Sequence, residues 1–287
     1  MSLLANMLSL VQDPPPEFVF EIAADGIAMS RTRPPASLQH VPLPEGVIAP
    51  SPVKDNVLDY DAYAHAVGQL AGRAAVSRGK RRGCTLILPD NSVRVAVLDF
   101  ESLPVKEEER LSLIKFRLRK TLPFDIDEAA FSYTLQKGTK VLAAIAPVEV
   151  IARYEAPFRA AGLQPGLVTS SSLAMLDLLP FTGSFMVAHK SPGGLTVLAI
   201  QNGILTLSRS LELTAHTADP LEEISADLYP TLIYIEDQTG LRPQKLMLVG
   251  FGPGSERLAI ELDIAVEAID APHPGLTGYL HSLKAAA

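Results

Sequence analysis

The chain has 287 residues, of which 47% are hydrophobic and 20% charged, and its formal net charge is −7. This composition supports a sizeable packed core, excludes global disorder and argues against nucleic acid as the main partner. No apolar run approaches the roughly 20 residues needed to cross a bilayer, and the N-terminus lacks the basic start and cleavage site of a secretory signal.

Residues 1–17 are predicted to form an N-terminal tail, either a frayed end or a short apolar helix that docks on a partner. A β-hairpin follows: an apolar strand from Phe18 is followed by a turn that contains Asp25 and Gly26, and a second strand ends at Arg31. Small residues and free backbone N–H groups are what a phosphate-binding hairpin needs. The first strand carries Glu21, so the sequence raises the question of whether this hairpin still binds a phosphate.

A proline-rich connector, residues 32–55, predicts strand edges and loop. Apolar residues at helical spacing predict a helix over 60–76, and the basic run at 78–83 is interpreted as a solvated loop. Two strands are expected at 84–90 and 93–100. The single cysteine, Cys84, opens the first of them, which predicts a buried thiol rather than a nucleophile and excludes an internal disulfide.

A helix is predicted over residues 104–124, because acids at its start and bases at its end complement the helix dipole. Pro123 ends it. Strands at 128–136 and 139–147 and a helix at 148–163 follow, the helix closed by Gly162. Residues 92–163 therefore predict a compact strand–helix–strand–strand–helix module.

The second half predicts a strand and helix at 166–180 and three strands within 184–213, with a hairpin turn at Asn202-Gly203. A helix ended by Gly240 and strands near 245–249 and 265–270 follow. A turn with Gly250, Gly252 and Gly254 follows the strand at 245–249. It could present N–H donors to a ligand at a helix start. It is neither a P-loop nor a dinucleotide fingerprint, and a plain tight turn is the alternative.

Catalytic and metal-binding patterns are weak. The six histidines show no paired spacing, so no metal site is predicted. The serines at 170–172 lack the GxSxG context of a nucleophile. Asp90, Asp99 and Asp177 lie near element boundaries, where the usual role of an acid is capping. No catalytic residue is therefore assigned.

The order of these elements resembles the actin-like ATPase (ribonuclease H-like) fold, a two-lobed α/β core with an inserted α+β module. More narrowly, it resembles the PilM family of type IV pilus assembly proteins. The specific motifs are "IKFRLRKTLPFDIDEAAFSY", residues 114–133, and Ala161-Gly162-Leu163 with Pro165. The resemblance implies a first lobe of residues 18–91 and 164–182, a module of 92–163, and a second lobe of 183–287 with a reduced or missing 2B subdomain.

Both phosphate hairpins depart from the family pattern. An active member has Asp-x-Gly in the first hairpin, where this chain has Glu21 and Ala23. The second hairpin has Ala188-His189-Lys190 in place of Asp-Ile-Gly. The resemblance therefore implies a pseudo-ATPase with no cofactor, ATP and Mg²⁺ being the alternative, and with a vestigial nucleotide site composed of Glu21, Asp25, Gly26, Gly250, Gly252 and Gly254.

By this resemblance the protein is a non-catalytic cytoplasmic adaptor at the inner face of the inner membrane. It would bind a short N-terminal peptide of a PilN-like membrane protein in a groove between the module and the first lobe. The candidate groove residues, for which module core is the alternative, are Phe116, Leu118, Arg119, Leu122, Pro123 and Phe124.

Two other functional classes stay open. One is an actin-like ATP-binding enzyme that uses Asp25 or Glu21 for its metal. The other is the cytoplasmic region of a GspL-like type II secretion protein, disfavoured because no membrane helix follows the core. An FtsA-like role is disfavoured because there is no amphipathic C-terminal tail.

Overall fold

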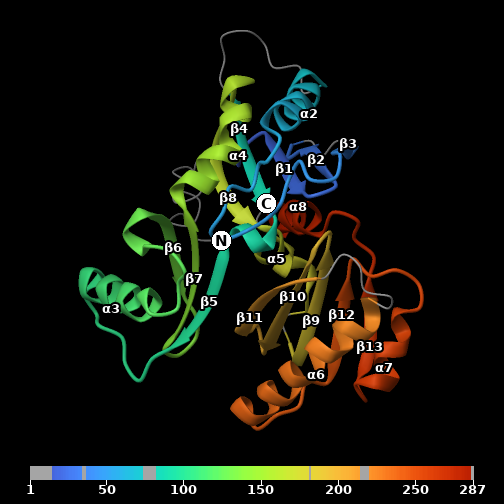
Figure 1. The fold of residues 1–287 in the computed structure, drawn as a ribbon. Coiled ribbons are helices and arrows are strands. Elements are labelled where there is room, and N and C mark those ends of the chain that lie inside the picture. Colours follow the sequence, from blue (N-terminus) through green and yellow to red (C-terminus); the bar gives the residue numbers. More distant parts are fainter. Residues whose placement is uncertain (1–14, 34–36, 74–81, 181, 214–219, 286–287) are drawn as a thin grey trace, which may run out of the picture.

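The computed structural model describes residues 15–33, 37–73, 82–180, 182–213 and 220–285. The expectations for the N-terminal tail and for most of the basic run at 78–83 lie outside these residues. Figure 1 shows two lobes with a third, smaller sheet at their side. Within the described residues there are two five-stranded sheets and one three-stranded sheet.

The first lobe is built on the sheet β3-β2-β1-β4-β8. The first three strands form an antiparallel meander, and β4 and β8 continue in parallel with β1. The strands are β1 (Phe18–Ala23), β2 (Gly26–Arg31), β3 (Gln39–Pro42), β4 (Arg82–Leu88) and β8 (Leu163–Ser170).

Alternation along β1 divides the first lobe into two packed faces. Phe18, Phe20 and Ile22 are buried against the helices α2 (Tyr60–Arg73) and α4 (Val148–Ala160). Val19 and Glu21 point to the opposite face, where Val19 packs with Leu276 of the C-terminal helix α8 (Pro274–Ala285). This alternation directs Glu21 toward the start of α8.

The second lobe repeats the same topology in the sheet β11-β10-β9-β12-β13. Its helix α6 (Pro220–Thr239) covers one face. Only residues 213–219 separate β11 from α6, too few for a further subdomain. The strands are β9 (Ser184–Ser191), β10 (Gly194–Gln201), β11 (Ile204–Glu212), β12 (Lys245–Val249) and β13 (Ala265–Ile269).

The inserted module is an antiparallel sheet in the order β5-β7-β6 with one long helix. Its elements are β5 (Arg94–Asp99), α3 (Glu107–Arg119), the short 3-10 turn η2 (Ile126–Glu128), β6 (Ala129–Leu135) and β7 (Lys140–Pro147). On β7, Val141, Ala143 and Ile145 are buried in one cluster with two residues of α3, whereas Leu142 packs against the cores of both lobes. The module therefore contacts the lobes with one face and carries α3 on the other (Figure 1).

Two boundaries differ from those expected from the sequence. The helix α4 was assigned to the module, but Tyr154 and Phe158 belong to the core of the first lobe. The C-terminal helix α8 was not predicted and falls in the segment assigned to the second lobe. It packs on the first lobe through Leu276, Tyr279 and Leu280. Sequence order misassigned both helices because each returns across the molecule to a sheet formed earlier.

Candidate functional site

The two phosphate-hairpin positions converge on a small cavity between the lobes, here called the inter-lobe cavity. It is lined by the first turn from Glu21 to Asp25, by Asp90 and Ser171, by the end of β9 from His189, and by His273 before α8. Its volume is about 110 Å³. Pockets for drug-sized ligands measure roughly 300–1,000 Å³, so the cavity is small for a nucleotide.

The carboxylate of Glu21 is bound internally. Only 6% of Glu21 is exposed. It accepts hydrogen bonds from the Ser171 hydroxyl at 2.5 Å and from the backbone N–H groups of Gly275 at 3.1 Å and Leu276 at 2.8 Å. These two N–H groups open α8, where unpaired donors and the helix dipole favour an anion. Glu21 is thus a cap for α8, and the carboxylate expected to hold a metal is already satisfied by protein donors.

Gly275 explains how the carboxylate comes so close to the helix. A Cβ at this position would lie 2.8 Å from the Glu21 Oε1 atom and 2.8 Å from a methyl carbon of Ile87. Both distances are shorter than side chains tolerate. The glycine therefore allows the helix start to meet the acid, a pairing over 254 residues that no local pattern indicates.

A second buried pair joins the two lobes. Asp90, in the 3-10 turn η1 (Asp90–Ser92), lies 3.0 Å from Nδ1 of His189 at the end of β9. Asp90 also accepts a 2.8 Å hydrogen bond from the Ser172 N–H. Burial raises the pKa of Asp90, but the His189 and Ser172 hydrogen bonds outweigh it, and the net pKa lies below the ordinary value. Asp90 was expected to be a helix cap, and its pairing with His189 was not foreseen.

The glycine turn after β12 packs against the end of β9, and most of it does not face the inter-lobe cavity. Gly250 has φ +76°, and a Cβ there would lie 2.2 Å from the Lys190 carbonyl oxygen. Gly250 thus lets β12 approach the end of β9. Gly252 and Gly254 do not line the inter-lobe cavity. The expected helix start consists only of a 3-10 turn at Ser255–Arg257 and the short helix α7 (Leu258–Glu261).

Asp25 and Gly26 also differ from their expected roles. Asp25 lines the cavity but is exposed, and its backbone carbonyl accepts the Leu43 N–H. A Cβ on Gly26 would lie 2.2 Å from Nε2 of His40, so this glycine serves the packing of β2 on β3. Of the six vestigial-site candidates, the structure brings only Glu21, Asp25 and Gly250 together at the cavity.

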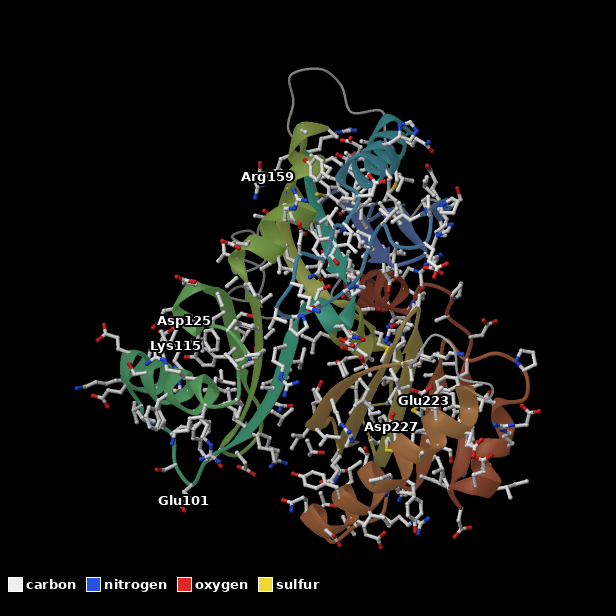
Figure 2. All side chains as sticks on the ribbon, viewed as in Figure 1. Glu101, Lys115, Asp125, Arg159, Glu223 and Asp227 are labelled. Atoms are coloured by element: carbon white, nitrogen blue, oxygen red, sulfur yellow. The ribbon has the colours of Figure 1, made fainter. Side chains whose placement is uncertain are left out.

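The six groove candidates lie at α3 and the segment that follows it, on the side of the module turned away from the lobes. Leu118 is fully buried, and Leu122 and Phe124 pack on the module core. The exposed Arg119 pairs with Asp127 at 2.5 Å. Figure 2 shows Lys115 and Asp125 on this outer side. The candidates that remain exposed besides Arg119 are Phe116 and Pro123. None of the six lines either of the two hollows beside the connector, and a groove formed by these residues stays a prediction.

A larger hollow surrounds the connector instead, and we call it the connector groove. One part, of about 480 Å³, is lined by Val53 and by the first turns of α4 from Pro147 to Arg153. The other, of about 530 Å³, lies between the connector, Asn91 and the second-lobe residues Ser191–Gly193. Lys54 and Asp55 line both parts. One part therefore lies beside the start of α4 and the other faces the second lobe, and the two share these connector residues.

The connector groove combines apolar walls with charged rims. Val53 is 50% exposed and Leu58 is 62% exposed. The Arg153 guanidinium and the Asp55 carboxylate, 3.1 Å apart, form an ion pair in the same groove. Arg153 also donates to the Val57 carbonyl at 3.3 Å, which fixes the connector to α4. Exposed apolar side chains next to fixed charges are typical of a peptide-binding surface.

The remaining sequence expectations concern isolated groups. Cys84 is buried, as expected, and burial raises its thiol pKa to about 12. Ser171 serves Glu21 rather than nucleophilic chemistry. Among the described residues no group of three or more His, Cys, Asp or Glu side chains could hold a metal ion. No helix in the described part of the chain is long and apolar enough to cross a membrane.

The fold is shared with proteins of known structure, whereas no protein-family model matches the chain and no curated protein is similar to it. A chain of the PilM–PilN type IV pilus biogenesis complex superposes with a TM-score of 0.72 at 19% identity, covering 95% of this chain and 99% of that one. The cytoplasmic domain of EpsL, an inner-membrane component of the type II secretion system of Vibrio cholerae, gives 0.57 at 9% identity, covering 94% of each.

An actin-like ATPase-fold protein of unknown function from Bacteroides thetaiotaomicron gives a TM-score of 0.55 at 15% identity, over 92% of this chain and 94% of that one. At these identities the likeness establishes the fold. The actin-like, two-lobed α/β architecture expected from the sequence is thereby confirmed, and so is its resemblance to a PilM-type chain at the level of the fold.

Proposed function

We propose that this chain is a non-catalytic adaptor of a type IV pilus or related secretion apparatus, acting at the cytoplasmic face of the inner membrane. The proposal rests on the hydrogen bonds that the Glu21 carboxylate accepts from Ser171 and from the start of α8. The full-length likeness to a chain of the PilM–PilN complex supports the same assignment.

Three features of the inter-lobe cavity oppose catalysis. Glu21 accepts three hydrogen bonds, which occupy three of the roughly four lone-pair positions of its carboxylate and leave little capacity for a metal-bound water. At the second hairpin, Ala188 is fully buried and carries no acid. The Lys190 backbone is packed against Gly250 rather than open to a phosphate. Turnover of ATP would require all three arrangements to change together.

The partner we propose is an extended N-terminal peptide of a PilN-like membrane protein, held in the connector groove. The exposed Val53 and Leu58 would receive apolar side chains. The polar rim of Lys54, Asp55 and Glu149 would fix the direction of the peptide. Extended peptides bind in this manner, with alternate side chains in pockets.

A second candidate has a specific observation in its favour. The likeness to cytoplasmic EpsL, with a TM-score of 0.57, supports a role as the cytoplasmic part of a type II secretion protein. The TM-score of 0.72 with the PilM–PilN chain favours the pilus adaptor. Both roles are non-catalytic, so the small inter-lobe cavity with its bound Glu21 carboxylate agrees with either.

Fluorescence anisotropy tests the proposed partner. A labelled peptide from the N-terminus of the PilN-like protein in the same genome is titrated with the full chain, and a scrambled peptide of equal composition is the control. Saturable binding by the native peptide alone supports the pilus adaptor. Equal weak binding of both peptides contradicts it, and selective binding of a peptide from a type II secretion partner instead favours the second candidate.

A further inference from the structure

The strand β6 is an edge of the module sheet, and it lacks the features by which proteins normally protect such edges. Its sequence AAFSYTL contains no charged residue and no proline. It pairs with β7 on one side, and no other strand of the described chain pairs with its second side. An uncharged edge of seven residues is a template for another strand.

The backbone groups on the free side are identified by the register with β7. Gln136 donates its N–H to the Lys140 carbonyl, and Leu135 lies opposite Val141. Bonded and free residues alternate along an antiparallel strand. Ser132 and Thr134 are therefore bonded to β7, whereas Phe131, Tyr133 and Leu135 direct their N–H and C=O groups outward.

The side chains of β6 leave room for a neighbouring strand. Phe131 and Tyr133 pack toward the module core, with ring centroids 5.9 Å apart, and Arg110 donates to the Tyr133 hydroxyl. On the opposite face the small side chains of Ala130, Ser132 and Thr134 are exposed. An incoming strand therefore meets an ordered aromatic face on one side and only small residues on the other.

The two ends of β6 carry opposite charge. Asp125, Asp127 and Glu128 precede the strand, and Lys137 follows it. Bases of α3 also lie at this end, where Lys115 and Arg119 pair with Asp127. Glu128 forms no ion pair within the described residues. An antiparallel copy of β6 would bring Lys137 to the acidic end of its neighbour, so the strand is complementary to itself.

We propose that β6 pairs in antiparallel fashion with β6 of a second copy of this chain, with Ser132 on the two-fold axis. This register places Phe131 opposite Tyr133 of the second copy and Ala130 opposite Thr134. It joins the outward backbone groups of Phe131 and Tyr133, and it sets aromatic side chains across the strand pair, which is a favourable arrangement. The interface is isologous, as in most homodimers. The inference does not rest on the proposed partner.

Sedimentation velocity of the full chain over a range of concentrations tests the dimer. Ser132→Lys places two like charges opposite each other, so the dimer dissociation constant should rise at least about tenfold. Ser112→Lys, an exposed change of the same charge on α3, is the control and should leave dimerisation unchanged. A wild-type chain that stays monomeric, or a Ser132→Lys dimer as tight as wild type, overturns the proposal.

Cross-linking tests the register and does not depend on the stability of the charge variant. In Ser132→Cys the new cysteine lies opposite the same cysteine of the second copy, at a non-hydrogen-bonded pair that is close enough for a disulfide. A mild oxidant such as diamide should therefore give a covalent dimer. Thr134→Cys faces Ala130 and should cross-link poorly. The native Cys84 is buried. Equal cross-linking at both positions, or none at Ser132→Cys, contradicts the stated register and the dimer that depends on it.

Discussion

The inter-lobe cavity and the connector groove are two hollows of one molecule with opposite properties. The first has a volume of about 110 Å³, and its two buried acids, Glu21 and Asp90, are bound to protein donors. The second has parts of about 480 and 530 Å³, and exposed apolar residues line it. In an actin-like fold the cleft between the lobes is the expected ligand site. Here Glu21 and Asp90 of that cleft are bound to protein donors, and the larger hollows lie beside the connector.

The largest effect should follow from removing the Glu21 carboxylate. Glu21→Ala leaves the Ser171 hydroxyl and two N–H groups of α8 buried without an acceptor, and should lower the free energy of unfolding by roughly 3–5 kcal/mol. Chemical denaturation measures this. Asp25→Ala, an exposed acid of the same cavity, should change stability by less than about 0.5 kcal/mol. Equal small losses for both variants would show that Glu21 is not a structural cap.

The next effect concerns the pair that joins the lobes. Asp90→Ala leaves His189 and the Ser172 N–H without their partner, and should cost roughly 2–4 kcal/mol. A double-mutant cycle with His189→Ala should give a coupling energy of about 1–3 kcal/mol.

Acidification offers a second test of this pair. The folded pKa of Asp90 lies below its ordinary value, so the stabilisation is present above about pH 4 and is lost as the pH falls through the folded pKa. A coupling energy near zero at neutral pH would mean that Asp90 and His189 do not interact across the lobes.

A change in the connector groove should affect binding and spare stability. Ala152 is an exposed groove residue of α4, and Ala152→Arg keeps a good helix former while filling the groove. The Kd for the PilN-like peptide should rise at least about tenfold, or 1.4 kcal/mol, with an unchanged melting temperature. Ala160→Arg, exposed on the same helix outside the groove, is the matched control.

Phe116→Ala distinguishes the connector groove from the outer side of the module, where the sequence placed the peptide. This change should leave peptide affinity within about twofold if the connector groove binds the peptide. A larger loss in Phe116→Ala than in Ala152→Arg would return the binding site to α3.

The smallest effect is the pH dependence of His273, which stacks on His40 with ring centroids 5.3 Å apart. Burial lowers its pKa, and the nearby His40 adds to the shift, although Glu21 and Asp25 oppose it. The unfolded chain therefore binds a proton first, and stability should fall as the pH drops below about 6.5. His273→Gln should reduce the change in the denaturation midpoint between pH 7 and 5.5. If the midpoint of this variant depends on pH as strongly as that of the wild type, His273 is excluded as the titrating group.

The sequence predicted the elements whose signals are local. Strand alternation around the turn at Asn202-Gly203 predicted the hairpin of β10 and β11, and Asn202 and Gly203 indeed have positive φ. The charge pattern of residues 104–124 predicted α3. Gly162 and Gly240, both with positive φ, end helices where expected. These features depend on neighbouring residues only.

The sequence did not predict arrangements that depend on distant segments. Glu21 accepts hydrogen bonds from the N–H groups of α8 across more than 250 residues of sequence. The helix α8 begins with Pro274 and Gly275, which do not favour a helix in a sequence pattern. The strand β7 is apolar on both faces, because one face packs on α3 and the other on the lobes. An apolar run of this kind does not indicate which face a helix covers, so the sequence did not reveal that α3 lies on the side of the module turned away from the lobes.

Calorimetric titration of the purified chain with Mg-ATP, beside a titration with the PilN-like peptide, decides between an adaptor and a nucleotide-binding protein. We expect no heat of binding with Mg-ATP and saturable binding of the peptide. Micromolar Mg-ATP binding that is lost on changing Gly250 or the Asp90–His189 pair would contradict it, because the inter-lobe cavity would then be a nucleotide site and Glu21 would have to leave α8.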